Sequence, residues 1–269
     1  MSSGPNKSVV FFGNEKLATG IATPQPLIRQ AVEAAGFTIE KIITGPLSTL
    51  GEHQSQLAVL AAYGHIIPQK ILDEFPLGII NIHPSLLPKY RGSTPIEQAL
   101  LDGEMKTGVS IMKLEAAMDT GPLYKQKTIH LRGDETKQEL TNQLQQLGAT
   151  LLKEVLPHIA DGSLKPRAQP HPVRATYTQL ITKQHSIIDW QKPAHQLERE
   201  IRAFAGWPQS RTTLGSVDVI VTKAHVGKSD EKLSIKCGDG NYLVIDSLKP
   251  AGKKEMPAVA FLAGYSSKL

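Results

Sequence analysis

Short apolar runs alternate with helical segments in the first part of the chain. The runs are KSVVFFG (7–13), QLAVLAAYG (56–64) and LGIINIHP (77–84). Helical segments follow the first two, at 24–35, where Gly36 closes the helix, and at 68–75. Apolar strands that alternate with helices form parallel sheets whose two faces are both covered. The pattern therefore predicts a doubly wound, Rossmann-like α/β fold with a mostly parallel sheet.

The remaining segments predict a second domain. A helix at 95–101, strands at 107–114 and 123–131 and a long helix from about 136 to 160 complete the first domain, which we expect to span residues 1–170. The segment from 161 to 175 (DGSLKPRAQPHPVRA) carries three prolines, which is typical of an exposed connector. We assign residues 171–204 to the connecting region, which includes most of the helical segment PAHQLEREIRAFAG (193–206). Short alternating strands within 211–250 predict a small OB-like β-barrel over residues 205–269.

Charge is unevenly distributed along the 269 residues. Residues 1–170 contain 16 Lys and Arg against 16 Asp and Glu, whereas residues 171–269 contain 14 against 9, so the net charge of +5 lies entirely in the second part. Such an excess favours a polyanionic partner, although an ordinary solvated surface gives the same count. The apolar content of 40% excludes a disordered chain.

The sequence also limits the chemistry and the compartment. Cys237 is the only cysteine, so no intramolecular disulfide forms and a cysteine-based metal site is not expected. The opening MSSGPNKS lacks the pattern of a secretory signal, and no apolar run approaches the roughly 18–20 residues of a membrane span. We therefore expect a cytoplasmic protein without a membrane partner.

Three polar residues are candidates for catalysis. Asn81 and His83 are separated by one residue at the end of a predicted strand, so both side chains leave the same face of the sheet. An amide donor beside an imidazole suits acyl transfer, which needs a donor for a developing oxyanion and a group that handles a proton. Asp119, on a later loop, could orient the imidazole. Spacing alone leaves open a structural His83, a turn-forming Asp119 and a capping Asn81.

Seven short segments carry a resemblance to a known family. The order N-x-H, SLLPKYRG and then MDTG resembles the folate-dependent formyltransferase superfamily. The segments IDW, LEREIRAF, Trp207-Pro208 and PAGKKEM resemble the linker and the C-terminal barrel of methionyl-tRNA formyltransferases, so the resemblance covers nearly the whole chain.

The resemblance implies a reaction. A formyl group would pass from 10-formyltetrahydrofolate, the co-substrate, to the amine of initiator methionyl-tRNA, with neither a metal nor a covalent enzyme intermediate. Asn81 would donate to the formyl oxygen, His83 would assist proton transfer and Asp119 would orient and tune His83. The folate-contacting segment of the family corresponds to Ser85, Leu86, Leu87 and Pro88.

Other residues have two interpretations each. Arg91 could contact the 3′ end of a tRNA or form a salt bridge that holds its loop, and Tyr63 and Gly64 could shape a pterin pocket or form a plain turn. For phosphate contacts in the C-terminal barrel we select Lys249, Lys253 and Lys254, which could instead be a solvated cluster. The aromatic content of 5% and the lack of an obvious apolar surface helix favour a monomer.

The chain departs from the family pattern between its second and third predicted strands. Residues 45–56 leave room only for a connector or a short helix, where family members carry a basic loop and further elements, so the sheet could lack an edge strand. This shortening bears on tRNA recognition more than on formyl transfer. Two alternatives therefore stay open: a sugar-nucleotide N-formyltransferase, and a catalytically weakened RNA-binding relative.

Overall fold

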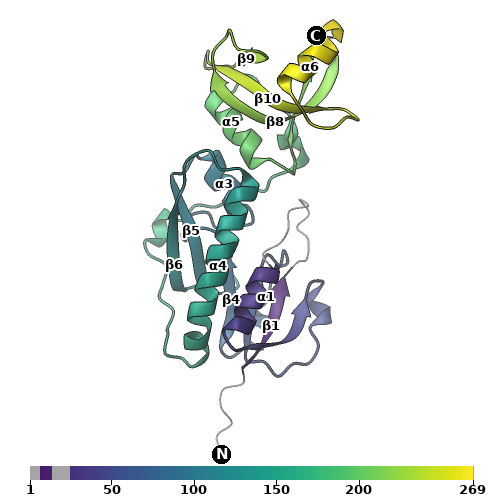
Figure 1. The fold of residues 1–269 in the computed structure, drawn as a ribbon. Helices are drawn as coiled ribbons and strands as arrows, with labels where there is room; N and C mark the ends of the chain where they lie inside the picture. Colours follow the sequence, from purple (N-terminus) through teal and green to yellow (C-terminus); the bar gives the residue numbers. More distant parts are fainter. Residues whose placement is uncertain (1–6, 14–24, 269) are drawn as a thin grey trace, which may run out of the picture. The chain divides into compact units, whose positions relative to one another are not determined.

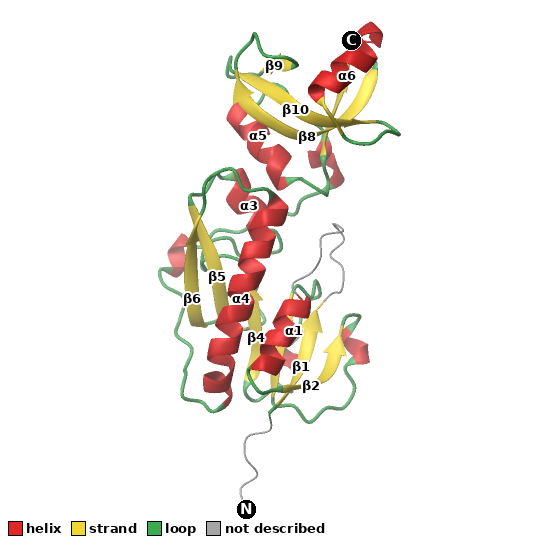
Figure 2. Ribbon diagram, in the orientation of Figure 1, coloured by secondary structure: helices red, strands yellow, loops and turns green. Residues whose placement is uncertain are grey.

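The computed structural model describes residues 7–13 and 25–268, which belong to two compact units (Figure 1). The first unit comprises Met1–Pro95, Met105–Leu131 and Glu139–Gln179. The second comprises Ile96–Glu104, Arg132–Gln138 and Leu180–Leu269. Each unit has its own β-sheet (Figure 2).

The first unit is built on a six-stranded sheet of order β2-β1-β3-β4-β5-β6. The first four strands pair in parallel, whereas β4–β5 and β5–β6 are antiparallel, so β4 joins the parallel half to the antiparallel half. The strands are β1 (Ser8–Gly13), β2 (Thr38–Ile43), β3 (Leu57–Ala61), β4 (Gly78–His83), β5 (Lys106–Lys113) and β6 (Leu123–His130). The helices are α1 (Gln25–Ala34), the short α2 (Gln69–Leu72) and α4 (Lys137–Ala160), with 3₁₀ turns at Leu47–Thr49 and Pro172–Arg174.

Both faces of this sheet are covered, as the alternation of apolar segments predicts. On one face α4 approaches the sheet closely at Gly148, where an added Cβ would lie 2.8 Å from a methyl carbon of Ile82 on β4 and 3.9 Å from Ile28 on α1. On the other face, alternate strand residues such as Val10 and Phe12 join a buried cluster with residues from the connections after β2 and β3. The doubly wound α/β prediction is confirmed.

Individual elements follow their sequence signals. Helix α1 ends before Gly36, whose φ of +85° is a conformation that glycine adopts at low cost. Pro24, where we expected this helix to begin, lies outside the described residues. The shortened stretch 45–56 holds only the 3₁₀ turn Leu47–Thr49, and β2 forms the edge of the sheet.

The second unit contains an antiparallel sheet of order β11-β10-β8-β7, with β9 also paired to β10. Its strands are β7 (Ser210–Leu214), β8 (Val217–Gly227), β9 (Ser234–Lys236), β10 (Tyr242–Pro250) and β11 (Met256–Pro257). Its helices are α3 (Pro95–Leu101, which belongs to this unit from Ile96 onward), α5 (Ala194–Ala203) and α6 (Ala258–Tyr265). It also has 3₁₀ turns at Lys183–Ser186 and Ser266–Lys268. Within the described residues β7 and β11 do not pair, so closure into an OB-like barrel remains a prediction.

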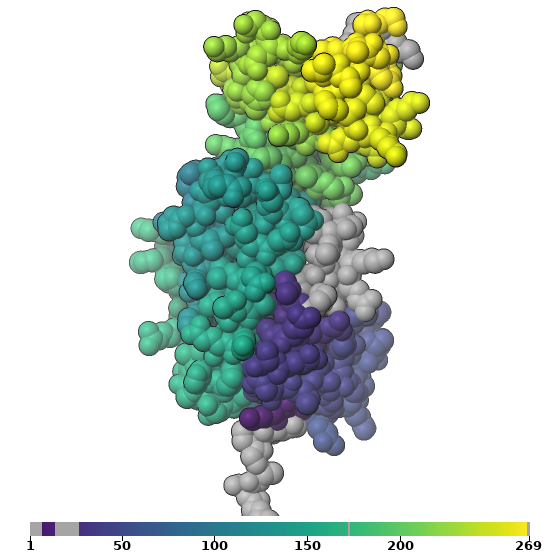
Figure 3. Space-filling view, viewed as in Figure 1, coloured from purple at the N-terminus to yellow at the C-terminus, as the bar shows by residue number. Residues whose placement is uncertain are grey.

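A buried apolar cluster holds the second unit together. Side chains of α5, including Leu197 and Ile201, pack against strand residues such as Val219 and Leu243, and Phe261 of α6 is fully buried in the same cluster. Helix α6 was not predicted, because its nearly uniform apolar composition gives no amphipathic period. In the space-filling view α6 lies at the surface of this unit, where Val259 is exposed (Figure 3).

A largely buried ion pair joins two segments from the middle of the chain within the second unit. Lys137 is almost fully buried; its Nζ donates to the carbonyl of Trp207 (2.9 Å) and lies 3.7 Å from Oε1 of Glu97. Burial lowers the pKa of Lys137 and raises that of Glu97, and their mutual attraction opposes both shifts.

The compact units differ from the expected domain boundaries. We expected the first domain to end at residue 170, but the first unit extends to Gln179 because residues 176–178 bond to the backbone of residues 90 and 91. Conversely, Ile96–Glu104 and Arg132–Gln138 cluster with the second unit. Among the described residues, no helix is long and apolar enough to cross a membrane.

One histidine of the second unit is bonded on both ring nitrogens. His225 on β8 lies with Nδ1 3.0 Å from Asp246 Oδ1 on β10 and with Nε2 3.2 Å from Glu231 Oε2 in the loop that follows β8. The other carboxylate oxygen of Glu231 accepts the backbone N–H of Lys228. The hydrogen bond that the protonated ring donates to Asp246, together with the smaller effect of the one it donates to Glu231, outweighs partial burial and raises the pKa of His225 above its ordinary 6.5.

This arrangement predicts a pH-dependent contribution to stability. Because the folded-state pKa of His225 is raised, the contribution is fully present below about pH 6.5 and is lost as the pH rises through the raised value. We expect the free energy of unfolding of wild type to exceed that of His225→Gln by more at pH 6 than at pH 9, measured by urea denaturation. His195→Gln, at an exposed histidine of α5, is the control. A gap that is constant or grows with pH would contradict this assignment.

Candidate functional site

The candidate site lies at the carboxyl end of β4 in the first unit. Asn81 and His83 are both buried there, at the crevice edge where open α/β sheets bind ligands. The Asn81 amide nitrogen has a sulfur neighbour, Met112 Sδ on β5, at 3.8 Å. Sulfur is a weak acceptor, so this amide keeps its capacity to donate to an oxygen.

The backbone fixes the tautomer of His83. Nε2 lies 2.9 Å from the carbonyl oxygen of Tyr90, and because a carbonyl can only accept, we assign the ring proton to Nε2. Nδ1 of the neutral ring is then a proton acceptor. Tyr90 itself has a φ of +61°, which is unfavourable for a bulky residue, and Thr176 holds it by accepting the Tyr90 N–H at Oγ1 (2.9 Å).

Asp119 faces the free nitrogen of His83. Its Oδ2 lies 3.8 Å from Nδ1, too far for a hydrogen bond but close enough for electrostatic attraction once the ring is protonated. The same oxygen accepts the backbone N–H of Gly92 at 2.7 Å, which fixes the carboxylate. The structure therefore brings His83 and Asp119 together from β4 and from the loop between β5 and β6.

A polar network extends from this loop. Gln169 donates to the carbonyls of Asp119 (2.7 Å) and Gly121 (2.9 Å), and its own oxygen accepts from Arg91 (2.6 Å). Arg91 also donates to the hydroxyl of Tyr177 at 3.1 Å, while its buried Nε has no hydrogen-bond partner within the described part of the chain. We had considered that a salt bridge holds Arg91 in its loop. In the described residues the side-chain partners of Arg91 are instead the neutral Gln169 and Tyr177.

The predicted folate segment is fixed by β5 and β6. Ser110 Oγ donates to the carbonyl of Ser85 (2.6 Å) and accepts the N–H of Leu87 (3.1 Å), and Gln126 donates to the Leu87 carbonyl (2.9 Å). The Ser85 and Leu87 side chains are buried, whereas Leu86 and Pro88 are half-buried. Of the four predicted residues, Leu86 and Pro88 thus offer accessible side-chain surface.

Tyr63 and Gly64 lie in the connection that leads from β3 to α2. The Tyr63 hydroxyl donates to the carbonyl of Gly45 at 2.7 Å and the ring packs edge-on against Phe12, so this side chain belongs to the core. Burial raises the pKa of its hydroxyl. The structure supports the turn interpretation for these two residues.

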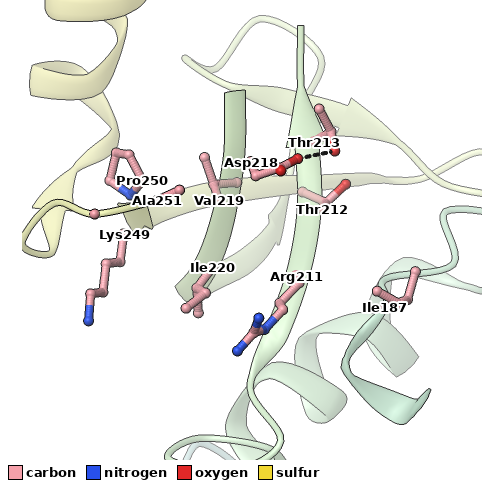
Figure 4. Close-up of a pocket in the computed structure, with 11 residues that line it drawn as sticks. Ile187, Arg211, Thr212, Thr213, Asp218, Val219, Ile220, Lys249, Pro250 and Ala251 are labelled. Atoms are coloured by element: carbon pink, nitrogen blue, oxygen red, sulfur yellow. Dashed lines mark hydrogen bonds between the residues drawn. The ribbon is translucent and has the colours of Figure 1, made fainter. Parts of the chain in front are cut away.

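The second unit carries a separate cavity of about 530 Å³ (Figure 4). Val219, Ile220 and Pro250 give it an apolar lining, and Arg211 and Lys249 extend to the same side of the sheet. The predicted Lys253 and Lys254 are exposed in the turn that follows.

Sequence reasoning missed several residues around His83. Tyr90 and Ser110 gave no signal because their contacts depend on tertiary packing, and Gln169 lay in a proline-rich segment that we expected to be exposed. That expectation is wrong for Gln169, which is buried. Among the described residues, no group of three or more histidine, cysteine and acidic side chains could hold a metal ion.

Comparison with known proteins identifies the family of this chain. The formyl transferase family matches residues 47–156, and the formyl transferase C-terminal domain matches residues 180–266. The methionyl-tRNA formyltransferase of Roseiflexus castenholzii is 37% identical over 262 residues, which cover 91% of this chain and 82% of the relative.

Solved structures share the fold. The methionyl-tRNA formyltransferase from Clostridium thermocellum matches with a TM-score of 0.62 at 16% identity, over 90% of this chain and 98% of that protein. The N-formyltransferase from Helicobacter canadensis, in complex with folinic acid and dTDP-3-aminofucose, matches with a TM-score of 0.65 at 16% identity, over 89% and 98%. At 37% identity to a curated relative across most of both sequences, the chain belongs to the methionyl-tRNA formyltransferase family.

Proposed function

We propose that this protein transfers a formyl group from 10-formyltetrahydrofolate to the amine of initiator methionyl-tRNA. The observation that carries the proposal is the pairing of His83 Nδ1 with Asp119 beside the Asn81 amide, at the carboxyl end of β4. The identity to methionyl-tRNA formyltransferases supports the choice of acceptor.

The co-substrate supplies the formyl group, and the residues of the site act on charge and protons. Asn81 Nδ2 would donate a hydrogen bond to the formyl oxygen as negative charge develops there. The attacking amine would lose a proton to Nδ1 of His83, because Nε2 is already donating to the Tyr90 carbonyl. The same proton would pass to N10 of the departing tetrahydrofolate, so the imidazole ends as it began.

Asp119 would stabilise His83 in its charged form. The imidazolium would lie 3.8 Å from the Asp119 carboxylate and would keep its bond to the Tyr90 carbonyl. The bond from the Gly92 N–H holds the carboxylate so that it does not need to reorganise when the charge appears.

The residues near His83 fit a folate. Leu86 and Pro88 offer apolar surface on either side of Leu87 in the sequence, and Leu87 itself packs with Met112 and Leu123 in one buried cluster. Ligand pockets combine such apolar walls with a few polar groups, a role that Asn81 and His83 would fill. Contact of residues 85–88 with the folate is part of this proposal.

We place the acceptor's phosphates against the second unit. Its excess of positive charge includes the exposed Lys249, Lys253 and Lys254, beside the cavity that Arg211 also lines. The short connection at 45–56 means that the chain would bind tRNA without a basic loop at that position. We further propose a metal-free, monomeric, cytoplasmic enzyme, with catalysis in residues 1–170 and RNA contacts in residues 205–269.

An acceptor assay tests the function. Purified protein is incubated with 10-formyltetrahydrofolate and either methionyl-initiator tRNA or an amino-sugar nucleotide, and formylated products are counted. We expect N-formylmethionyl-tRNA, and a decrease of about 10²–10⁴-fold in its rate of formation for His83→Ala, because the proton acceptor is lost. His158→Ala, at an exposed histidine of α4, serves as the matched control and should retain wild-type activity.

Two results would overturn the proposal. Formylation of the sugar nucleotide with inert tRNA would assign the chain to sugar modification. Binding of tRNA without turnover on either acceptor would indicate an RNA-binding relative that has lost catalysis.

Salt dependence tests the role of the lysines. We expect Lys249→Ala, Lys253→Ala and Lys254→Ala each to weaken tRNA binding and to lower the slope of log K against log[salt] by about 1, because each removes one phosphate contact. Filter binding between about 50 and 200 mM salt measures the slopes. Lys232→Ala, at an exposed lysine in the loop after β8, is the control and should keep the wild-type slope. Slopes equal to that of wild type in all four variants would exclude Lys249, Lys253 and Lys254 from the RNA contacts.

A further inference from the structure

Gln169 is a buried glutamine in an otherwise polar and mostly exposed segment. Residues 161–175 contain three prolines, and most side chains around Gln169 are exposed, but Gln169 keeps only 7% of its surface accessible. A pair of antiparallel backbone bonds between Arg167 and Leu123 (2.7 and 2.8 Å) fixes the segment two residues earlier. A buried polar side chain in such a place needs partners, and Gln169 has three.

The amide nitrogen of Gln169 is directed at the loop that carries Asp119. It donates to the carbonyls of Asp119 (2.7 Å) and Gly121 (2.9 Å), so both hydrogens are used. The loop also packs closely against β5: an added Cβ at Gly121 would lie 1.9 Å from the Lys113 carbonyl oxygen, so only glycine fits there. Gln169 thus fixes the backbone of a loop that lies about 50 residues earlier in the chain.

The backbone of Asp119 gains from this support. Its φ of +50° lies in the left-handed region, which aspartate adopts more readily than most non-glycine residues but still at a cost in free energy. The side chain receives one bond from the Gly92 N–H and the backbone carbonyl receives one from Gln169. Together the two bonds determine where Oδ2 lies relative to His83.

Arg91 fixes the other end of the glutamine amide. Its guanidinium donates to Gln169 Oε1 at 2.6 Å, and this charged donor sets which end of the amide is oxygen. Arg91 is itself buried and is anchored by the Arg91 N–H to the Thr176 carbonyl (2.8 Å). The amide therefore has a single satisfied orientation, with its nitrogen towards Asp119.

We propose that Gln169 is a positioning residue for formyl transfer, which acts through Asp119 rather than on either substrate. This inference rests on the proposed function for its assay. If Gln169 sets the distance between Asp119 and His83, removing its two donated bonds should reduce the chemical step and leave substrate binding nearly unchanged.

Two variants separate the contribution of the Gln169 amide donor from that of its acceptor oxygen. Gln169→Met keeps the size without polar atoms, and Gln169→Glu keeps an acceptor for Arg91 but replaces the donor. In both we expect kcat to fall about 10–100-fold, with KM for 10-formyltetrahydrofolate and for tRNA within about two-fold of wild type. Gln179→Met, at an exposed glutamine of the same connector, should match wild type.

A double-mutant cycle distinguishes positioning from general destabilisation. In an Asp119→Asn background, measured under single-turnover conditions, Gln169→Met should cost less than about three-fold, because the residue through which it acts has already been altered. Equal losses in both backgrounds, or an unchanged kcat in Gln169→Glu and Gln169→Met with intact thermal unfolding, would overturn the inference. All rates are taken relative to wild type on whichever acceptor wild type formylates, so a wrong acceptor assignment and a wrong role for Gln169 give different results.

Discussion

The hydrogen bond between His83 Nε2 and the Tyr90 carbonyl determines what the site can do. It leaves Nδ1 as the only ring nitrogen that can accept a proton, and it orients that nitrogen towards Asp119. The bond depends on a loop in which Tyr90 holds an unfavourable left-handed conformation. Backbone and side-chain bonds from Thr176 stabilise that loop, so a connector far along the chain supports the histidine.

The neighbouring strands and loops hold the other residues of the site in fixed positions. β4 lies in the middle of the sheet, so Asn81 and His83 are held between β3 and β5 and cannot shift with a mobile edge. β5 supplies Ser110, which fixes residues 85–87, and the connection from β5 to β6 supplies Asp119. The geometry of the proposed site is thus produced by the central strand β4 together with loops that are tied to neighbouring strands.

Much of this could be predicted from the sequence where the signal was local. The alternation of apolar runs and helices predicted the sheet, α3 was predicted at residues 95–101, and the N-x-H and MDTG motifs led to the family. Signals that depend on tertiary contacts were absent: Gln169 resembled any connector residue, and Lys137 resembled an exposed lysine at a helix start although it is buried against Trp207. Helix α6 was missed because residues 258–265 are too uniformly apolar to show a helical period.

The most direct test of this account is the tautomer of His83. In protein labelled with ¹⁵N at histidine, the ring nitrogens of His83 can be assigned by their loss in His83→Ala and followed by NMR at a pH where the ring is neutral. We predict a protonated Nε2 and an unprotonated Nδ1, since the Tyr90 carbonyl accepts from Nε2. A neutral ring protonated at Nδ1 would show that His83 donates to Asp119 instead, and would contradict the assignment of Nδ1 as the atom that accepts the proton of the amine.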